Sequence, residues 1–139
     1  MSVLDDLAVK LVADGVGVMG TGTYAPNTIY LSSAAILPAG AGPQITLSET
    51  GGVAPTRIQN KGSVATIRPT VQVLVRATSY AVARAKSLAA YQSLDGNFNV
   101  TINSNFYLSI TARQEPTDMG QTAGSALIVF NLDIEKAPS

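Results

Sequence analysis

The feature that most constrains the fold is an alternation of apolar and polar side chains between residues 98 and 112. Its apolar members are Phe98, Val100, Ile102, Phe106, Leu108, Ile110 and Ala112. Successive side chains of a β-strand point to opposite faces of the sheet, so this period of two predicts strands with one buried face. The alternation is interrupted by the Asn-Ser-Asn sequence of residues 103–105, which predicts the turn of a β-hairpin.

Further strands are expected on either side of this hairpin. Residues 126–135 repeat the alternation, and an extended pattern that begins at residue 63 includes the alternating Val71, Val73 and Val75. Two shorter apolar runs, at residues 28–37 and 44–48, are also predicted as strands. Residues 50–62 and 114–124 lack any periodicity and are predicted as loops.

Two segments carry helical periodicity instead. Leu4, Leu7 and Leu11 form one apolar stripe near the N-terminus, and Asp5 and Asp6 stand in the first turn, where negative charge favours the helix dipole. A second helix is expected between residues 80 and 94. Its packing face is predicted to carry Tyr80, Arg84, Leu88 and Tyr91, with Ala81, Ala85 and Ala89 alongside, which keep that face thin enough to pack closely on a sheet. Two helices collected on one face of a mostly antiparallel β-sheet make an α+β fold, and we expect residues 1–139 to form a single domain.

The composition argues against most enzyme chemistry. The chain has no cysteine and no histidine, which excludes a Ser-His-Asp triad, a Cys-His dyad and a thiolate or imidazole metal site. Three pairs of nearby carboxylates remain, at residues 5 and 6, 115 and 118, and 133 and 135, and each is better explained as a capping or solvated group. We therefore expect no enzyme, no catalytic residue, no cofactor and no metal.

The charge content points to a protein that is covered by partners. Only 13% of the residues are charged, about half the usual share, and nine basic residues balance nine acidic ones. A free monomer with so few charges is poorly protected against association, although a neutral surface rich in small polar residues is an alternative explanation. The isoelectric point near 6.1 speaks against nucleic-acid binding, and no apolar run is long enough to span a membrane.

Three segments in a fixed order resemble a known family. They read LSETGG at residues 47–52, VQVLVR at residues 71–76, and YAVARAK at residues 80–86 in a helix that ends with Leu94-Asp95-Gly96. The chain thereby resembles the tail terminator, or tail completion, proteins (minor capsid proteins) of long-tailed bacteriophages. The resemblance covers nearly the whole chain, but residues 21–43 are longer and richer in Ala, Gly and Ser than the family pattern.

The resemblance implies a structural virion protein of the tail and neck, assembled in the host cytoplasm. It implies a homo-hexameric ring on the head-proximal end of the tail tube, which ends tube polymerisation and offers the head-docking surface. The implied partners are other copies of the chain, the tail tube protein and a head-closure or connector protein. Genomic DNA passes through the lumen without being read, and no membrane is involved.

Five residues are candidates for assembly contacts. Arg57 and Lys61 lie in one predicted loop, and Glu115 and Asp118 lie in the other, so charges of opposite sign could set the register between subunits or against the tube. Tyr107 is expected on the polar face of its strand, beside Ser109, Thr111 and Arg113, and this face is the leading candidate for a partner surface.

Two other interpretations stay open on the sequence. One is another neck or tail protein, either a head-closure subunit or a tail tube subunit. Tube subunits usually consist almost entirely of β-structure, so the two predicted helices argue against a tube subunit. The other is a small binding module for a ligand or nucleic acid, which predicts a stable monomer with a defined pocket. A carboxylate enzyme ranks third, because it needs two acidic side chains that converge in a cleft.

Overall fold

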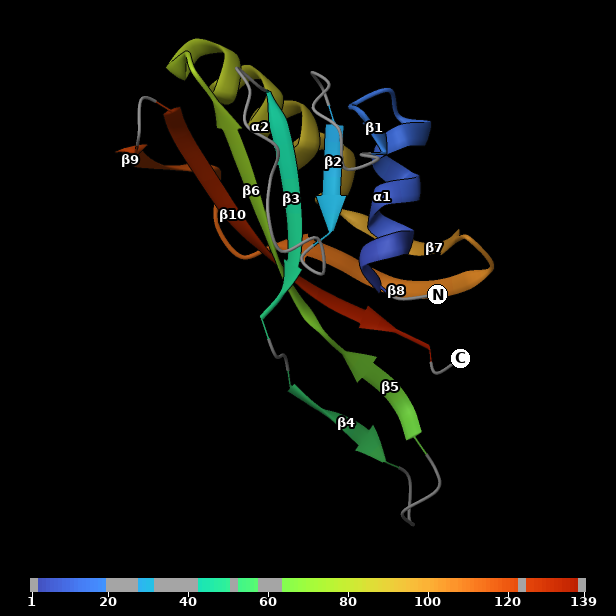
Figure 1. The fold of residues 1–139 in the computed structure, drawn as a ribbon. Helices are drawn as coiled ribbons and strands as arrows, with labels where there is room; N and C mark the ends of the chain where they lie inside the picture. Colours follow the sequence, from blue (N-terminus) through green and yellow to red (C-terminus); the bar gives the residue numbers. More distant parts are fainter. Residues whose placement is uncertain are drawn as a thin grey trace.

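The computed structural model describes residues 3–19, 28–31, 43–50, 53–57, 64–122 and 125–137. Within these residues the chain forms α1 (Val3–Ala13), β1 (Val18–Met19), β2 (Thr28–Leu31), β3 (Gln44–Glu49), β4 (Val53–Arg57), β5 (Val64–Arg68), β6 (Thr70–Ala77), α2 (Tyr80–Leu94), β7 (Asn97–Ile102), β8 (Asn105–Ala112), β9 (Thr117–Thr122) and β10 (Ser125–Lys136). Figure 1 shows one twisted sheet with both helices beside it and a hairpin, β4–β5, that extends away from the body.

The sheet is built around β10, its longest strand. One edge of β10 pairs antiparallel with β6 from Ala126 to Asp133, and with β5 at Lys136. The other edge pairs with β9 near the start of β10 and with β8 near its end. Beyond β6 follow β3, β2 and β1, and only the β1–β2 and β2–β3 pairs are parallel. The sheet is therefore mostly antiparallel, as predicted.

Both helices pack on one face of the sheet and form the core with it. The predicted stripe of α1 is buried, since Leu7 and Leu11 have no exposed surface, and α2 packs against β6 and β10. The Tyr91 ring of α2 meets the Phe130 ring of β10 edge-on, at 5.7 Å between centroids. The α+β prediction, with two helices on one face, is confirmed. No helix among the described residues is long and apolar enough to cross a membrane.

The buried side of α2 is different from the predicted one. Ala83, Ser87, Ala90 and Leu94 face the core, whereas Tyr80 is 43% exposed and Arg84, Leu88 and Tyr91 are only half-buried. The stripe of small side chains lets the helix axis approach the sheet closely. Large side chains on that side would have held the helix away, so residue size and not hydrophobicity alone selects the packing face.

The β7–β8 hairpin is confirmed, but its alternation shifts at a β-bulge. Ser109 pairs with Glu135 while Tyr107 pairs with the next residue, Lys136, so Leu108 has no partner opposite it. An extra residue in one strand moves every later side chain to the other face. Tyr107 is consequently fully buried on the helix side of the sheet, and its predicted place on the polar face is wrong.

The two predicted loops contain edge strands. Residues 50–62 include β4, and residues 114–124 include β9. Both strands are interrupted by irregularities in register, next to Pro55 in β4 and Gly120 in β9, which is why the sequence carries no period-two signal there. Of the strand predicted at residues 28–37, residues 28–31 form β2, and the remainder lies outside the described residues.

Candidate assembly surface

In the part of the chain that the structure describes, no helix lies over one face of the sheet, and this face is called the uncovered face below. The alternation of β3, β6, β8 and β10 directs one set of side chains to the helices and the other set to this face. The strand register places on the uncovered face the polar residues Ser48, Gln72, Ser109, Thr111, Asn131, Asp133 and Glu135. It adds Leu74, Arg76, Leu127 and Val129 at the end of the face where β10 begins. The predicted partner surface thus exists as a surface with Ser109, Thr111 and Arg113, but without Tyr107.

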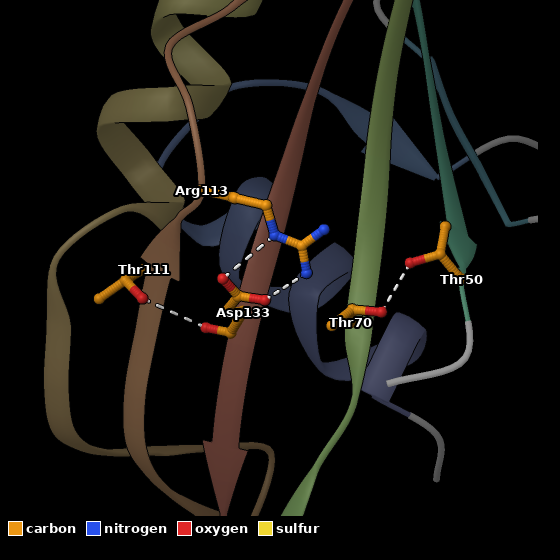
Figure 2. A network of polar contacts seen from close by, with 5 residues as sticks. All are labelled: Thr50, Thr70, Thr111, Arg113 and Asp133. Carbon is orange, nitrogen blue, oxygen red and sulfur yellow. Dashed lines mark hydrogen bonds and ion pairs between the residues drawn. The ribbon is translucent and has the colours of Figure 1, made fainter. Parts of the chain in front are cut away.

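A polar network organises the middle of the uncovered face, as Figure 2 shows. The guanidinium of Arg113 donates to both carboxylate oxygens of Asp133, at 2.6 and 3.3 Å, and this ion pair raises the pKa of Arg113. The Thr111 hydroxyl donates to the Asp133 backbone carbonyl at 3.4 Å. Between β6 and the residue that follows β3, the hydroxyls of Thr70 and Thr50 are 2.7 Å apart. These contacts hold short polar side chains flat against the strands.

A groove of about 350 Å³ lies beside this network, at the junction between β5 and β6. It is lined by Arg68, Pro69, Thr70, Ser109, Thr111, Asp133, Ile134 and Glu135. Glu135 makes no ion pair with any described residue, whereas Asp133 is already paired with Arg113. The lining thus combines hydroxyls and carboxylates with the basic Arg68, which suits a hydrogen-bonding partner side chain. Among the described residues no group of three potential metal ligands occurs.

Two exposed aromatic rings extend the uncovered face beyond the groove. Phe98 pairs with Ser109 and therefore points to the same face. Phe106 precedes the buried Tyr107 beyond the bulge, so its ring points away from the core, to the side of Ser109. Phe98 is 59% exposed and Phe106 is 40% exposed. An aromatic pair that is left in solvent next to a polar groove is typical of a surface that contacts another protein.

The hairpin of β4 and β5, called the arm below, projects from the end of this face (Figure 1). β4 pairs with β5, and β5 meets the body through the Ile67–Lys136 pair with β10. Residues 50–69 contain three basic residues, Arg57, Lys61 and Arg68, and no acidic one. Arg57 is the last residue of β4, opposite Val64, whereas Lys61 lies outside the described residues.

The acidic candidates lie at the other end of β10. Glu115 and Asp118 are exposed, and the Asp118 carboxylate accepts a hydrogen bond from the Gly120 backbone N–H at 2.8 Å. Gly120 has a φ of 84°, a conformation that favours glycine. Because β9 pairs with the first residues of β10 and β5 pairs near its last, one subunit does not bring these acids and the arm together.

The structure also contains a buried polar cluster that the sequence did not predict. The Asp6 carboxylate of α1 is fully buried and accepts hydrogen bonds from Asn103 at 3.2 Å, from Asn105 at 2.9 Å and from the Tyr107 hydroxyl. Burial and the nearby Asp6 carboxylate raise the pKa of Tyr107. The Lys136 ammonium lies 5.5 Å from the centre of the Tyr107 ring. The cluster fastens the β7–β8 hairpin, and hence one end of the uncovered face, to α1.

A comparison with solved structures finds the same fold in a phage-like particle. A chain of the structure titled "Virion of native gene transfer agent (GTA) particle" superposes with a TM-score of 0.58. The match covers 99% of this chain and 96% of the other at 14% sequence identity, so it shows a shared fold. The comparison with curated proteins finds no match.

The comparison with family models covers most of the chain. The model described as "Bacteriophage tail terminator protein" matches residues 10–135, which include the end of α1, all of α2 and the strands up to nearly the end of β10. The match also agrees with the resemblance carried by residues 47–52, 71–76 and 80–96. The chain therefore belongs to the bacteriophage tail terminator family, and it is a structural protein of the virion tail.

Proposed function

We propose that this chain forms a closed ring on the head-proximal end of the tail tube, where it ends tube polymerisation and provides the surface to which the head docks. The observation that carries the proposal is the pairing of two incomplete features in one subunit. Among the described residues, no helix lies over the uncovered face, and β4 of the arm pairs with β5 alone. A subunit with two different surfaces for partners suits a head-to-tail contact between copies. Such a contact forms a closed ring when the rotation from one copy to the next is a whole fraction of a full turn.

The partners of such a ring follow from its position. The ring contacts other copies of the chain within its own plane, the tail tube protein on one side and a head-closure or connector protein on the other. Six copies is the number that the family resemblance implies. Genomic DNA passes through the lumen unread, which fits a chain with equal numbers of acidic and basic residues.

The charged candidates are assigned to assembly contacts in this proposal. Arg57 and Lys61 belong to the arm, while Glu115 and Asp118 belong to the segment around β9 at the opposite end of β10. Surface charges of opposite sign contribute more to register and to the rate of association than to affinity. We assign no catalytic role to any residue, since the carboxylates of the uncovered face lie open beside hydroxyls and an arginine.

A tube-assembly experiment tests the proposal. Purified tail tube protein of the same phage is polymerised with increasing amounts of this chain, and tube lengths are measured by negative-stain electron microscopy. We expect the mean length to fall as the amount of the chain rises, with a ring visible at one tube end. An unchanged length distribution contradicts the proposal. Binding to filled heads without any effect on tubes favours the head-closure alternative instead.

A further inference from the structure

A second groove lies on the side of α2 that faces the end of α1, and it is called the helix groove below. It has a volume of about 470 Å³ and is lined by residues 14–16, which follow α1, and by Lys86, Ala89, Gln92 and Ser93 of α2. A Cβ added at Gly15 would meet no atom within 4 Å, so the groove is open at this point. The helix groove can therefore admit a side chain from another molecule.

The end of α1 forms one wall of the helix groove because a Schellman motif closes this helix. Gly15 has a φ of 74°, and its N–H donates to the Val12 carbonyl at 3.1 Å. The Val16 N–H donates to the Leu11 carbonyl at 2.9 Å. The Val16 carbonyl in turn accepts a hydrogen bond from the Lys86 ammonium at 2.6 Å, so Lys86 is held at the wall of the groove.

The helix groove holds a basic side chain without a carboxylate partner. Lys86 makes no ion pair with any described residue, and its ammonium has three N–H donors, of which the Val16 carbonyl takes one. The Asp14 carboxylate also lines the groove, but it is bound by the Lys10 ammonium at 2.8 Å and the Ser93 hydroxyl at 2.6 Å. Burial lowers the pKa of Lys86, so a carboxylate brought to its ammonium would stabilise the charged form.

Residues 114–122, called the acidic segment below, carry the complementary charge. Glu115 and Asp118 are exposed and form no ion pair among the described residues, and the segment contains no basic residue. Asp118 pairs with Ile128, which shares the helix side of β10 with Phe130, so Asp118 also lies on the side of the helices. In the described part of the chain β9 pairs with β10 alone, which leaves its other edge open to a neighbour.

The acidic segment and the helix groove lie on opposite sides of α2. Arg84 donates to the Pro116 carbonyl of the acidic segment at 3.2 Å, whereas Lys86 faces the end of α1. Two positions along a helix correspond to about 200° around its axis. Figure 1 shows the same arrangement, with β9 on one side of α2 and α1 on the other. The acidic segment of one copy therefore faces away from the helix groove of that copy.

From these observations we propose that the acidic segment of each copy lies in the helix groove of the next copy, where the carboxylates of Glu115 and Asp118 meet the Lys86 ammonium. The inference rests on the ring proposed above and names one contact within it. The occupant of the helix groove is thus a second copy of this chain. Each copy gives an acidic segment on one side and receives one on the other, so the contact is head-to-tail.

Reversal of charge on each side tests this contact. The variant Lys86→Glu makes the groove acidic, and the variant Glu115→Lys/Asp118→Lys makes the segment basic. Each variant alone sets like charges against each other at every contact, so we expect assembly of rings on tubes to slow about tenfold at low salt. The triple variant Lys86→Glu/Glu115→Lys/Asp118→Lys restores opposite charges and should assemble at close to the natural rate.

A mixture of the two variants shows whether the contact joins different copies. In a ring where they alternate, the natural acidic segment of one variant meets the natural groove of the other. The basic segment of that other variant meets the acidic groove of the first. Every contact then carries opposite charges, so the mixture should assemble at close to the natural rate although neither variant does so alone. A mixture as slow as its components overturns the proposal.

Two controls separate the contact from folding and from net charge. Lys86→Glu loses the hydrogen bond to the Val16 carbonyl, so its fold is checked by circular dichroism, and Lys86→Gln keeps an N–H donor without the charge. We expect Lys86→Gln to slow assembly about threefold, and an unchanged rate overturns the proposal. Arg68→Glu reverses an exposed charge outside the helix groove. Rescue of Glu115→Lys/Asp118→Lys by Arg68→Glu also overturns the proposal, because any added acidic residue would then suffice.

The same samples separate this contact from the proposed function. Tube length is measured for the natural chain and for every variant. Arrest of tube growth by the natural chain, together with unimpaired assembly of Lys86→Glu, overturns the contact but leaves the terminator function in place. Failure of the natural chain to arrest tube growth or to form rings overturns both proposals.

Discussion

The buried carboxylate of Asp6 links α1 to the β7–β8 hairpin, and its removal tests how much this link stabilises the fold. The change Asp6→Ala leaves the Tyr107 hydroxyl buried without an acceptor and removes one hydrogen bond each from Asn103 and Asn105. A buried unsatisfied hydroxyl costs about 1–3 kcal/mol, and a hydrogen bond to a charged group contributes about 1.5–3 kcal/mol. Because relief of the buried charge offsets part of this loss, we expect a net destabilisation of about 3 kcal/mol.

That loss is large against the total stability of about 5–15 kcal/mol that is usual for a domain. It corresponds to a fall in melting temperature of about 10 °C for a chain of this size. The assay is urea and thermal unfolding of the unassembled protein, followed by far-ultraviolet circular dichroism. The chain has no tryptophan, so fluorescence is a poorer probe.

Asp5→Ala is the matched control. It removes the same charge from the same first turn of α1, so both changes lose the favourable interaction with the helix dipole, which is about 0.3–1 kcal/mol. Only Asp6→Ala also removes the hydrogen bonds from Asn103, Asn105 and Tyr107, and we expect it to be the more destabilising change. Equal destabilisation by the two changes would refute the assigned role of Asp6.

Three further predictions concern pH, the uncovered face and the arm. The pKa of Tyr107 is raised in the folded state, so the stability that the Tyr107 hydroxyl contributes is full below its ordinary pKa near 10 and declines as the pH rises above that value. Tyr107→Phe should flatten this decline, which urea titrations between about pH 9 and 11.5 measure. Arg113→Ala breaks an exposed ion pair with Asp133, so the melting temperature should fall by less than about 3 °C, while tube arrest weakens if the uncovered face is a contact. Charge reversal by Arg57→Glu/Lys61→Glu should leave the circular dichroism spectrum unchanged and slow ring assembly at least tenfold at low salt, and intact assembly kinetics would count against the assignment of these two residues to assembly contacts.

The elements with strong periodicity were predicted correctly from the sequence. The stripe of Leu4, Leu7 and Leu11 forms α1, and the alternation after Ala126 forms β10. The Asn103-Ser104 turn was also predicted, and both residues adopt the positive φ that a two-residue hairpin turn requires. In each case the signal is local, since neighbouring residues alone determine it.

Errors arose where one residue changed the phase of a pattern. The bulge at Leu108 moved Tyr107 from the predicted polar face into the core, and nothing in the sequence around it marks an extra residue. The face of α2 was mispredicted because the helix carries two sets of small side chains, and the set of Ala81, Ala85 and Ala89 was chosen instead of the buried set of Ala83, Ser87 and Ala90. Size complementarity with the sheet decided that face, and it depends on residues far away in the sequence.

The missed strands and the missed cluster have other causes. β4 and β9 are edge strands with irregular pairing, and Pro55 and Gly120 give them the composition of loops. Asp6 meets Asn103, Asn105 and Tyr107 from about a hundred residues away, so no local pattern could associate them. Tyr107 was wrongly placed on the assembly surface because its true position depends on a bulge and on a contact with the distant Asp6.

The most direct test of the account is electron microscopy of particles from a phage that lacks a functional copy of this gene. The account predicts headless tails of irregular, excessive length, because tube growth is no longer stopped and no docking surface is present. Complementation with the natural chain should restore tails of uniform length that carry heads. Tails of normal length beside heads that leak DNA would contradict the terminator function and assign the chain to head closure.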